Sequence, residues 1–586
     1  MTKSGLASVA SSSHDPALDS SRGQRLLVFA LLLTGLAYAA TLRFGFVYDD
    51  LPQIVNNATL TTWKTLPSLF TEHSWKFLLP DWAGNYYRPL FMTWLLLNRK
   101  LVGVYAPAWH ATSILLHLIA TWMSFVVARQ LFRDSTKAGF VALLFGLHPI
   151  HVENVAWISG ATDTLMAVFA FAAFWAWIRS ERDPQHEGKW KALSAVFYVA
   201  SCLSKETGVL LPLVVVAHDY LWGRYERDWK GFWRSFWHAL PLWIAAAAYI
   251  VVRALVLHGL EHSVNEPIPH VLLTIPTIIW GYMRRLVWPV NMSVFYDTPP
   301  VTSPADVRFW LPMLALIVAA ILAWRIGKRS HLAGLGLAWL FIFLAPAILG
   351  IPAFSRGEWV HDRYLYLPSF GFCLLLVHAI SQLTTEREIF GLPAVPSAIA
   401  LVLAAAMAFG TTYEEQYWAN DLLLFAHATR VAPNSAWAKT HLANELYHRG
   451  DLQNVDQLYQ EALRIDPKAW KIRVSYGIVL FYLNQFQRAD EQLSEAIALV
   501  PYDSNPYFYQ GLSRFNLGNY TGAERGFKEA IQHSPHHVRY HFWLGFTYEK
   551  EGRLNEAKAE YQEELADHPD TDTVARERLN ALENRP

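Results

Sequence analysis

The chain has 586 residues, of which 53% are hydrophobic and 14% aromatic, and its 49 Lys and Arg residues balance 49 Asp and Glu residues. A formal net charge of zero provides no bulk basic field for nucleic acid, and only two cysteines exclude a disulfide framework or a cysteine-rich metal site. So many apolar and aromatic residues are unusual in a soluble protein, and they are concentrated between about residues 24 and 412. The sequence therefore predicts a membrane domain followed by a polar domain.

Residues 1–21 are rich in Ser and Ala and lack the apolar core of a signal peptide, so they are predicted to form a disordered tail. A spanning helix needs about 20 apolar residues. The domain at 22–412 contains eleven candidate spans, near 24–42, 109–128, 138–156, 161–178, 191–204, 207–222, 236–257, 310–325, 333–351, 362–380 and 394–412. The stretch 271–290 is predicted to be re-entrant or interfacial, because four residues interrupt it: Pro276, Arg284, Arg285 and Pro289.

Basic residues between the spans predict the orientation, because cytoplasmic loops are enriched in Lys and Arg. Arg22 and Arg25 precede the first span, and further basic clusters fall in cytoplasmic positions at 129–137, 179–191, 223–234 and 325–331. The N-terminus is therefore predicted to be cytoplasmic and the C-terminal domain non-cytoplasmic. Three polar segments then share the non-cytoplasmic face: "VYDD" at 47–50, "HPIHVENVAW" at 148–157 and "WVHDRYLYLPS" at 359–369.

Two adjacent carboxylates, Asp49 and Asp50, follow the first span directly. A carboxylate can take the proton from a hydroxyl as its oxygen attacks an electrophile, and a neighbouring carboxylate raises its proton affinity. The pair is therefore a candidate general base or sugar-binding group. A solvated loop or a helix cap is the alternative.

The segment "NYYRPLFMTW" at 85–94 places Arg88 beside two tyrosines, at the start of an apolar stretch. Its guanidinium can grip a phosphate through two parallel hydrogen bonds, or it can reach lipid headgroups as an interfacial arginine.

Between two later apolar runs, "GLHPIHVENVAWISGATDTL" at 146–165 contains His148, His151, Glu153 and Asp163. These groups suit hydrogen bonding to a sugar or a phosphate. A plain polar turn is one alternative, and metal binding by the two histidines is another, although no zinc pattern such as HExxH is present.

Further along, "SKETG" at 204–208 places Lys205 and Glu206 between two short apolar runs, where they either bind a ligand or form a local salt bridge. Arg363 and Tyr364 lie at the mouth of a span, and Arg363 either binds a phosphate or pairs with Asp362. Ionisable groups at membrane depth cost about 3 kcal/mol each and usually mark a functional cavity. Their predicted position on one face indicates a site for a lipid-linked phosphate donor.

Prolines occur every 34 residues, at 433, 467, 501, 535 and 569, which is the tetratricopeptide period. Small and aromatic residues recur in the expected positions, so four repeats are predicted at 434–569. A connecting half repeat is predicted at 413–433 and a cap or tail at 570–586. Such arrays commonly bind extended peptides, and a scaffold that holds a partner protein is the simplest interpretation of the array alone.

In their order, "FVYDD", "YYRPL", "HPIHVENVAWISGATDTL", "SKETG" and "DRYLYLPSFGF", followed by the repeats, resemble the transmembrane and tetratricopeptide-repeat O-mannosyltransferases. The resemblance covers roughly residues 24–570 and implies the C-type glycosyltransferase membrane fold. It also implies a polyprenyl- or dolichyl-phosphate sugar donor, action on the exoplasmic face and no metal or other cofactor.

The resemblance implies roles for individual residues as well. Asp49 is the expected catalytic base, with Asp50 as its companion. The expected donor-binding residues are Arg88, His148, His151, Glu153, Lys205, Glu206, Arg363 and Tyr364. This chain has "ISGATD" where animal members tend to have "IVGRAD", so Ala161 replaces an arginine and mannose is not implied.

The hypothesis is a membrane glycosyltransferase that moves one sugar from a polyprenyl-phosphate donor to a hydroxyl, such as Ser or Thr of exported proteins. The repeats would bind the acceptor protein or a partner. The expected location is a bacterial inner membrane, or the endoplasmic reticulum in a eukaryote, with the repeats on the non-cytoplasmic side. The alternatives are transfer to a lipid or glycan, with the repeats recruiting partners, and a non-enzymatic membrane scaffold.

Overall fold

The computed structural model describes residues 16–78, 85–257, 266–353, 359–383, 387–389, 392–568 and 573–584. These residues are mostly helical, and the chain divides into two compact units between His427 and Ala428. The predicted all-α class, with several membrane spans followed by a helical repeat array, is confirmed. The division lies within the predicted connecting segment 413–433, and the remaining domain boundaries stay predictions.

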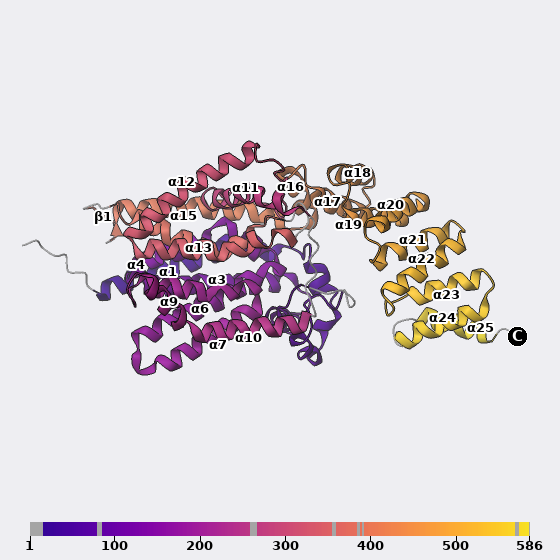
Figure 1. The fold of residues 1–586 in the computed structure, drawn as a ribbon, viewed down its shortest axis with the longest axis horizontal. Coiled ribbons are helices and arrows are strands. Elements are labelled where there is room, and N and C mark those ends of the chain that lie inside the picture. Colours follow the sequence, from indigo (N-terminus) through magenta and orange to yellow (C-terminus); the bar gives the residue numbers. More distant parts are fainter. Residues whose placement is uncertain are drawn as a thin grey trace, which may run out of the picture. The chain divides into compact units, whose positions relative to one another are not determined.

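The first unit is a bundle of helices (Figure 1). They are α1 (Pro16–Ala37), α2 (Pro89–Val102), α3 (Ala106–Phe132), α4 (Ser135–Leu147), α5 (Val152–Ala156), α6 (Thr162–Arg182), α7 (Glu187–Ser204), α8 (Leu211–Leu221), α9 (Trp229–His238), α10 (Leu240–Leu257), α11 (Ile268–Val287), α12 (Val307–Arg329), α13 (His331–Leu349), α14 (Tyr366–Ile380), α15 (Ala394–Glu414) and α16 (Asp421–Val431). A short antiparallel pair, β1 (Glu388–Ile389) and β2 (Leu392–Pro393), precedes α15. Because α1 begins at Pro16, residues 16–21 are helical rather than part of the predicted tail, whose residues 1–15 lie outside the described part.

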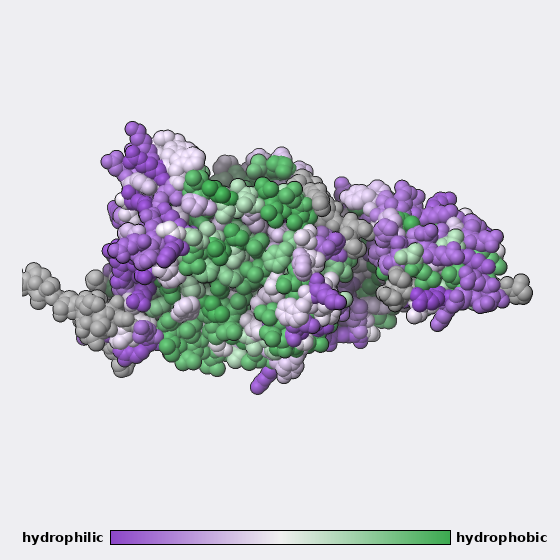
Figure 2. Space-filling model, turned by 90° about the horizontal axis from the view of Figure 1, so that it is seen from below, coloured by the Kyte–Doolittle hydropathy of each residue, from purple (hydrophilic) through white to green (hydrophobic). Residues whose placement is uncertain are grey.

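Eight helices of the described chain are long and apolar enough to cross a membrane: α1, α3, α6, α10, α12, α13, α14 and α15. A ninth crossing is formed if α4 and the segment 149–156, which are bent by 52°, count as one span. The other two predicted crossings correspond to α7, which begins with charged residues, and α8, which has 11 residues. Figure 2 shows the apolar belt of this unit beside a hydrophilic end. The stretch 271–290 forms most of α11, and its relation to a membrane stays a prediction.

Small residues let some of these helices approach closely. A Cβ added at Gly371 on α14 would lie 2.4 Å from the backbone oxygen of Gly336 on α13. Helices in a membrane associate mainly through such close packing, because lipid tails are as apolar as the side chains. The pair α13 and α14 forms one wall of the site described below.

The second unit stacks helical hairpins: α17 (Ala436–His448) with α18 (Val455–Ile465), α19 (Trp470–Tyr482) with α20 (Phe486–Leu499), α21 (Ser504–Asn516) with α22 (Tyr520–His533), and α23 (Tyr540–Lys550) with α24 (Leu554–Asp567), followed by α25 (Thr573–Glu583). The 34-residue period recurs in the turn within each hairpin, where the backbone has positive φ at Gly450, Asn484, Gly518 and Gly552. It recurs in the packing as well, because Gly477, Gly511 and Gly545 face Leu493, Phe527 and Tyr561. The last predicted repeat proline, Pro569, lies outside the described residues.

Candidate active site

A cavity of about 290 Å³ opens in the first unit where the first loop meets the ends of several helices. Its polar lining includes Asp49, Gln53, Ser74, Tyr86, Arg88, Ser159, Asp163, Lys205, Glu206, Arg363 and Tyr364. The first loop contributes the lining residues from position 49 to position 88, the start of α6 contributes Asp163, and the turn after α7 contributes Lys205 and Glu206. Residues separated by more than 300 positions thus line one space, as the hypothesis requires of Asp49 and Arg363.

The two adjacent carboxylates have different surroundings. Asp49 lines the cavity, whereas Asp50 is fully buried behind it. Asp50 accepts hydrogen bonds from the backbone N–H and the hydroxyl of Ser159, at 2.8 and 2.6 Å, and from the backbone N–H of Val47 at 3.3 Å. Burial raises the pKa of Asp50 to about 7 even though Ser159 lowers it. Asp50 therefore fastens the loop to the residues before α6, and Asp49 is the carboxylate that can reach a ligand.

Tyr48, directly before Asp49, has a backbone φ of 54°. This left-handed conformation costs about 1–2 kcal/mol in a residue with a Cβ and needs support from its surroundings. The support comes from Asp421, which accepts a hydrogen bond from the Tyr48 N–H at 2.8 Å, and from an aromatic cage around the Tyr48 ring. The ring lies 5.6 Å from Trp157 and 5.8 Å from Phe425, between ring centroids.

Three cations of the cavity are each held by a carboxylate. Arg88 donates two hydrogen bonds to Glu206, at 2.9 and 2.6 Å. Lys205 donates to both oxygens of Asp163, at 2.7 and 2.6 Å. Arg363 donates through its backbone N–H and its guanidinium to Glu153. The three pairs fix the cations in place before any ligand enters.

These pairs differ from the pairs between sequence neighbours that the sequence offered as alternatives, Lys205 with Glu206 and Arg363 with Asp362. Lys205 and Glu206 do not form a salt bridge with each other: Lys205 pairs with Asp163, and Glu206 pairs with Arg88. Arg363 pairs with Glu153, whereas the neighbouring Asp362 turns away and accepts a hydrogen bond from Tyr296 at 2.5 Å. The ring of Tyr364 is close to two cations: the charged groups of Lys205 and Arg363 are each 5.2 Å from its centroid.

Burial and charge act in opposite directions on these groups. Burial by itself would raise the pKa of Glu206, but the Arg88 guanidinium lowers it to about 2. Burial lowers the pKa of Lys205, and the Asp163 carboxylate counteracts this change. An opposite charge within a few ångströms favours the charged form in this way. Glu206 is therefore a carboxylate at neutral pH and keeps Arg88 charged.

One wall of the cavity is apolar. It is formed by side chains at the end of α13 and the start of α14: Phe343, Pro346, Ala347, Leu367 and Pro368. The three cation–carboxylate pairs thus lie beside an apolar surface.

The two predicted histidines do not line the cavity. His148 and His151 are fully buried, and they bond to different oxygens, His148 to the carbonyl of Leu286 at 3.0 Å and His151 to the hydroxyl of Ser369 at 2.8 Å. Glu153 is also buried and reaches the site only through Arg363. The structure therefore places these three residues behind the lining of the cavity, and their part in donor binding stays a prediction.

Other lining residues were not on the predicted list. Asp163 lies in a predicted polar segment but is not among the predicted donor-binding residues, and Tyr86 stands beside Arg88 in the segment 85–94. Ser74 and Trp75 come from a part of the first loop without a recognisable pattern. The supporting Asp421 precedes the repeats and has no sequence signal either. Asp163 had a sequence signal, because it is a charged residue that lies with other polar residues between two apolar runs.

Two segments match known families. Residues 87–252 match the family described as dolichyl-phosphate-mannose-protein mannosyltransferase, and residues 508–572 match the tetratricopeptide repeat. Among solved structures, a crystal structure of MamA aligns with 28% of this chain and 94% of its own, at 20% identity and a TM-score of 0.25, which is too weak to inform the fold.

Curated relatives cover more of the chain. Protein O-mannosyl-transferase F38B6.6 of Caenorhabditis elegans is 26% identical over 75% of this chain and 63% of its own length. Human protein O-mannosyl-transferase TMTC1 is 26% identical over 73% of this chain and 54% of its own, and Tmtc2 of Drosophila melanogaster is 32% identical over 33% and 22%. The chain thus spans about half to two thirds of the length of the first two relatives. In its ordered motifs, its mannosyltransferase match and its repeats, the chain is similar to the transmembrane and tetratricopeptide-repeat protein O-mannosyl-transferases.

Proposed function

We propose that this protein transfers a single sugar from a polyprenyl-phosphate donor to a hydroxyl group of Ser or Thr in an exported protein. The observation that carries the proposal is one cavity that holds Asp49, three fixed cations and an apolar wall. A lipid-linked sugar phosphate needs each of these features: an apolar surface for its chain, cations for its phosphate and a base for the acceptor. The names of the matched family and relatives support the same class of reaction.

In the proposed step, Asp49 removes the proton from the acceptor hydroxyl while the oxygen forms a bond to the anomeric carbon of the sugar. The bond from that carbon to the phosphate oxygen breaks, and the lipid phosphate leaves with the electron pair. Arg88, Lys205 and Arg363 stabilise the negative charge on the leaving phosphate. Because attack and departure occur on opposite sides of the carbon, the configuration inverts.

The site is proposed to face the non-cytoplasmic side. The cavity uses the first residues of α6 and α14, the turn after α7 and the last turn of α13. Basic residues lie at the opposite ends of α6 and α7 and just before α13: Arg179 and Arg182 on α6, Lys189 on α7, and Arg329 at the end of α12. Since α6 has 21 residues, it is roughly 30 Å long, about the thickness of the hydrocarbon core. The positive-inside rule then assigns the basic ends to the cytoplasm.

The repeats are proposed to bind the acceptor protein. Helical repeat arrays present an extended surface to peptides, and the second unit has the regular 34-residue packing such a surface requires. The sugar is left open, because this chain has Ala161 where the animal relatives tend to have an arginine. Ala161 is fully buried.

The test uses the purified full-length protein in lipid vesicles, with a panel of polyprenyl-phosphate sugars and Ser/Thr-containing peptides. Mass spectrometry should detect one added hexose-type mass on a peptide with one donor, and Asp49→Asn should lower the rate at least 100-fold while insertion and thermal stability are retained. Glu72→Gln, at an exposed pair in the same loop, is the matched control.

Other results would contradict the proposal in distinct ways. Full activity of Asp49→Asn would remove the assigned base. Sugar found on added lipid or glycan, and not on peptide, would support a different acceptor. If no donor is consumed and variants of Arg88 and Asp49 behave normally in cells while repeat variants do not, the protein is a scaffold.

A further inference from the structure

A short helix at the other end of the first unit, α9 (Trp229–His238), has three chemically different faces. In the sequence "WKGFWRSFWH", small and polar residues, aromatic residues and basic residues each recur with helical spacing. Gly231, Ser235 and His238 form the first face, Trp229, Phe232, Trp233, Phe236 and Trp237 the second, and Lys230 and Arg234 the third. The helix connects α8 to α10 within the basic segment that follows α8.

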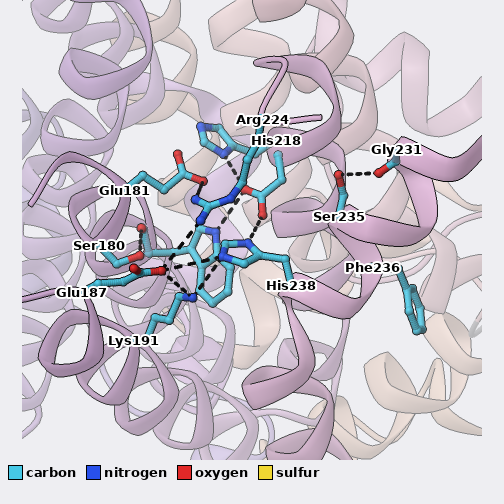
Figure 3. Close-up of polar contacts among 12 residues, drawn as sticks. Ser180, Glu181, Glu187, Lys191, His218, Arg224, Gly231, Ser235, Phe236 and His238 are labelled. Atoms are coloured by element: carbon cyan, nitrogen blue, oxygen red, sulfur yellow. Dashed lines mark hydrogen bonds and ion pairs between the residues drawn. The ribbon is translucent and has the colours of Figure 1, made fainter. Parts of the chain in front are cut away.

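The first face fastens α9 to the bundle (Figure 3). His238 is 2.7 Å from one oxygen of Asp219 through Nδ1, and the other oxygen of Asp219 accepts from His218 at 3.1 Å and Trp177 at 3.2 Å. The second ring nitrogen of His238 lies 3.0 Å from the Lys191 ammonium group, so both of its nitrogens are engaged. At the start of the helix, Asp228 caps the Gly231 N–H at 2.6 Å. These contacts therefore fix which face of α9 is turned towards the bundle.

That orientation leaves the aromatic face outside the bundle except at Phe236, which packs against the core of the first unit. Trp229 is 70% exposed and Trp237 is 59% exposed, with Trp233 and Phe232 also exposed. Two residues later α10 begins, and its side chains Leu240, Ile244 and Val251 are exposed as well. The aromatic face is thus continuous in sequence with an apolar helix that has the length and hydropathy of a membrane span.

The third face is positively charged. Among the described residues, the side chains of Lys230 and Arg234 make no hydrogen bond or ion pair, and both residues are exposed. The surrounding segment 223–234 carries four basic and two acidic residues. One of the acidic residues, Asp228, is occupied by the cap of α9.

From these observations we propose that α9 lies in the membrane interface and binds anionic phospholipid headgroups. Its Trp and Phe rings enter the boundary between headgroups and acyl chains, where amphipathic aromatic rings are favoured. Lys230 and Arg234 then lie at headgroup depth and attract negative charge. The occupant is a lipid surface because the aromatic face leads directly into a spanning helix, and because the adjacent cations complement anionic headgroups. This inference is independent of glycosyl transfer.

Nitroxide labels on the full-length protein test the position of the helix. The two native cysteines, Cys202 and Cys373, are buried, so single cysteines introduced as Trp233→Cys and, separately, Trp237→Cys can be labelled selectively. In vesicles of phosphatidylcholine and phosphatidylglycerol at 3:1, collisions with oxygen should exceed collisions with a water-soluble nickel complex at both positions. Leu452→Cys, an exposed position in the repeats, should give the opposite ratio. Equal nickel access at 233, 237 and 452 would overturn the proposal.

The charge requirement is tested with spin-labelled lipids. The protein should hold labelled phosphatidylglycerol more strongly than labelled phosphatidylcholine, and Lys230→Gln with Arg234→Gln should reduce that preference about two-fold. The matched control, Lys550→Gln at an exposed position of the repeats, should leave it unchanged. An unchanged preference in the double variant would overturn headgroup binding. Spin–spin broadening between labels at 233 would show that a second copy covers the face, which also overturns it.

Discussion

The backbone N–H of Tyr48 donates a hydrogen bond to Asp421 at 2.8 Å, across 373 positions of sequence. The bond supports a residue with positive φ directly before the proposed base Asp49. Asp421 begins α16, and Phe425 on the same helix packs against the Tyr48 ring. The loop that presents Asp49 is therefore positioned by a helix that continues to Val431, beyond the end of the first unit.

Asp421→Ala is expected to lower the transfer rate about 10-fold, because a small displacement of a catalytic group is costly. The effect should appear in kcat, with little change in KM for the donor, since the cation pairs remain intact. Asp421→Asn retains an oxygen acceptor and should restore most of the rate. Steady-state kinetics in vesicles measure both values, and equal rates for the Ala variant and the unsubstituted protein would show that the bond does not position Asp49.

The buried Asp50 is expected to make stability depend on pH. Burial raises its pKa from 3.8 to about 7, so the folded protein favours the protonated carboxyl. The protonated carboxyl therefore favours the folded state. This contribution to the free energy of unfolding is fully present below about pH 4 and is lost as the pH rises towards 7; it amounts to at most about 4 kcal/mol. Asp50→Asn should flatten the decline of the apparent Tm between pH 4 and 7.

Ser159 offers a second measurement on the same carboxyl. Its hydroxyl lowers the pKa of Asp50 by bonding the charged form, so Ser159→Ala should move the pH window upwards. A decline of Tm that is identical in all three proteins would contradict the assignment of this pH dependence to Asp50.

The Lys205–Asp163 pair is expected to behave as a buried ion pair, because its side chains are only 4% and 5% exposed. Asp163→Asn leaves a buried ammonium group without its counter-charge and should destabilise the protein by about 3–5 kcal/mol. The double variant Asp163→Asn, Lys205→Met should be more stable than the single one but inactive. Apparent Tm values and activity assays of the single and double variants measure the coupling.

An exposed pair provides the contrast. Lys76 and Glu72 are 46% and 37% exposed, so Glu72→Gln should change stability by less than about 1 kcal/mol. If Asp163→Asn were as mild as Glu72→Gln, the buried pair would not hold Lys205 in the cavity.

Glycine in the repeats is expected to be required for packing. A Cβ at Gly511 would lie 2.7 Å from the ring of Phe527, so Gly511→Ala should destabilise the α21–α22 hairpin by about 1–3 kcal/mol. Gly188→Ala is the control, because a Cβ there meets nothing within 4 Å. Hydrogen exchange should increase in α21 and α22 for the first variant only, and unchanged exchange would show that the ring can move aside.

The helical class, the order of the membrane helices and the repeat period could all be predicted from the amino-acid sequence. These properties depend on local composition and on spacing along the chain, which the sequence contains directly. The residues Asp49, Arg88, Lys205, Glu206, Arg363 and Tyr364, predicted from polar interruptions of apolar runs, line one cavity in the structure. The reason is that buried charge is costly and is retained where helix ends converge on a polar space.

Which of these groups contact each other could not be predicted from the sequence and became visible in the folded chain. Adjacent residues separate in space: Asp49 faces the cavity and Asp50 the core, while Lys205 and Glu206 pair with Asp163 and Arg88. His148 and His151 form hydrogen bonds inside the bundle, and Asp421 supports Tyr48 although the two residues are 373 positions apart in the sequence. Pairing and side-chain direction follow from how helices pack, and a buried charge takes whichever partner that packing brings within hydrogen-bond distance.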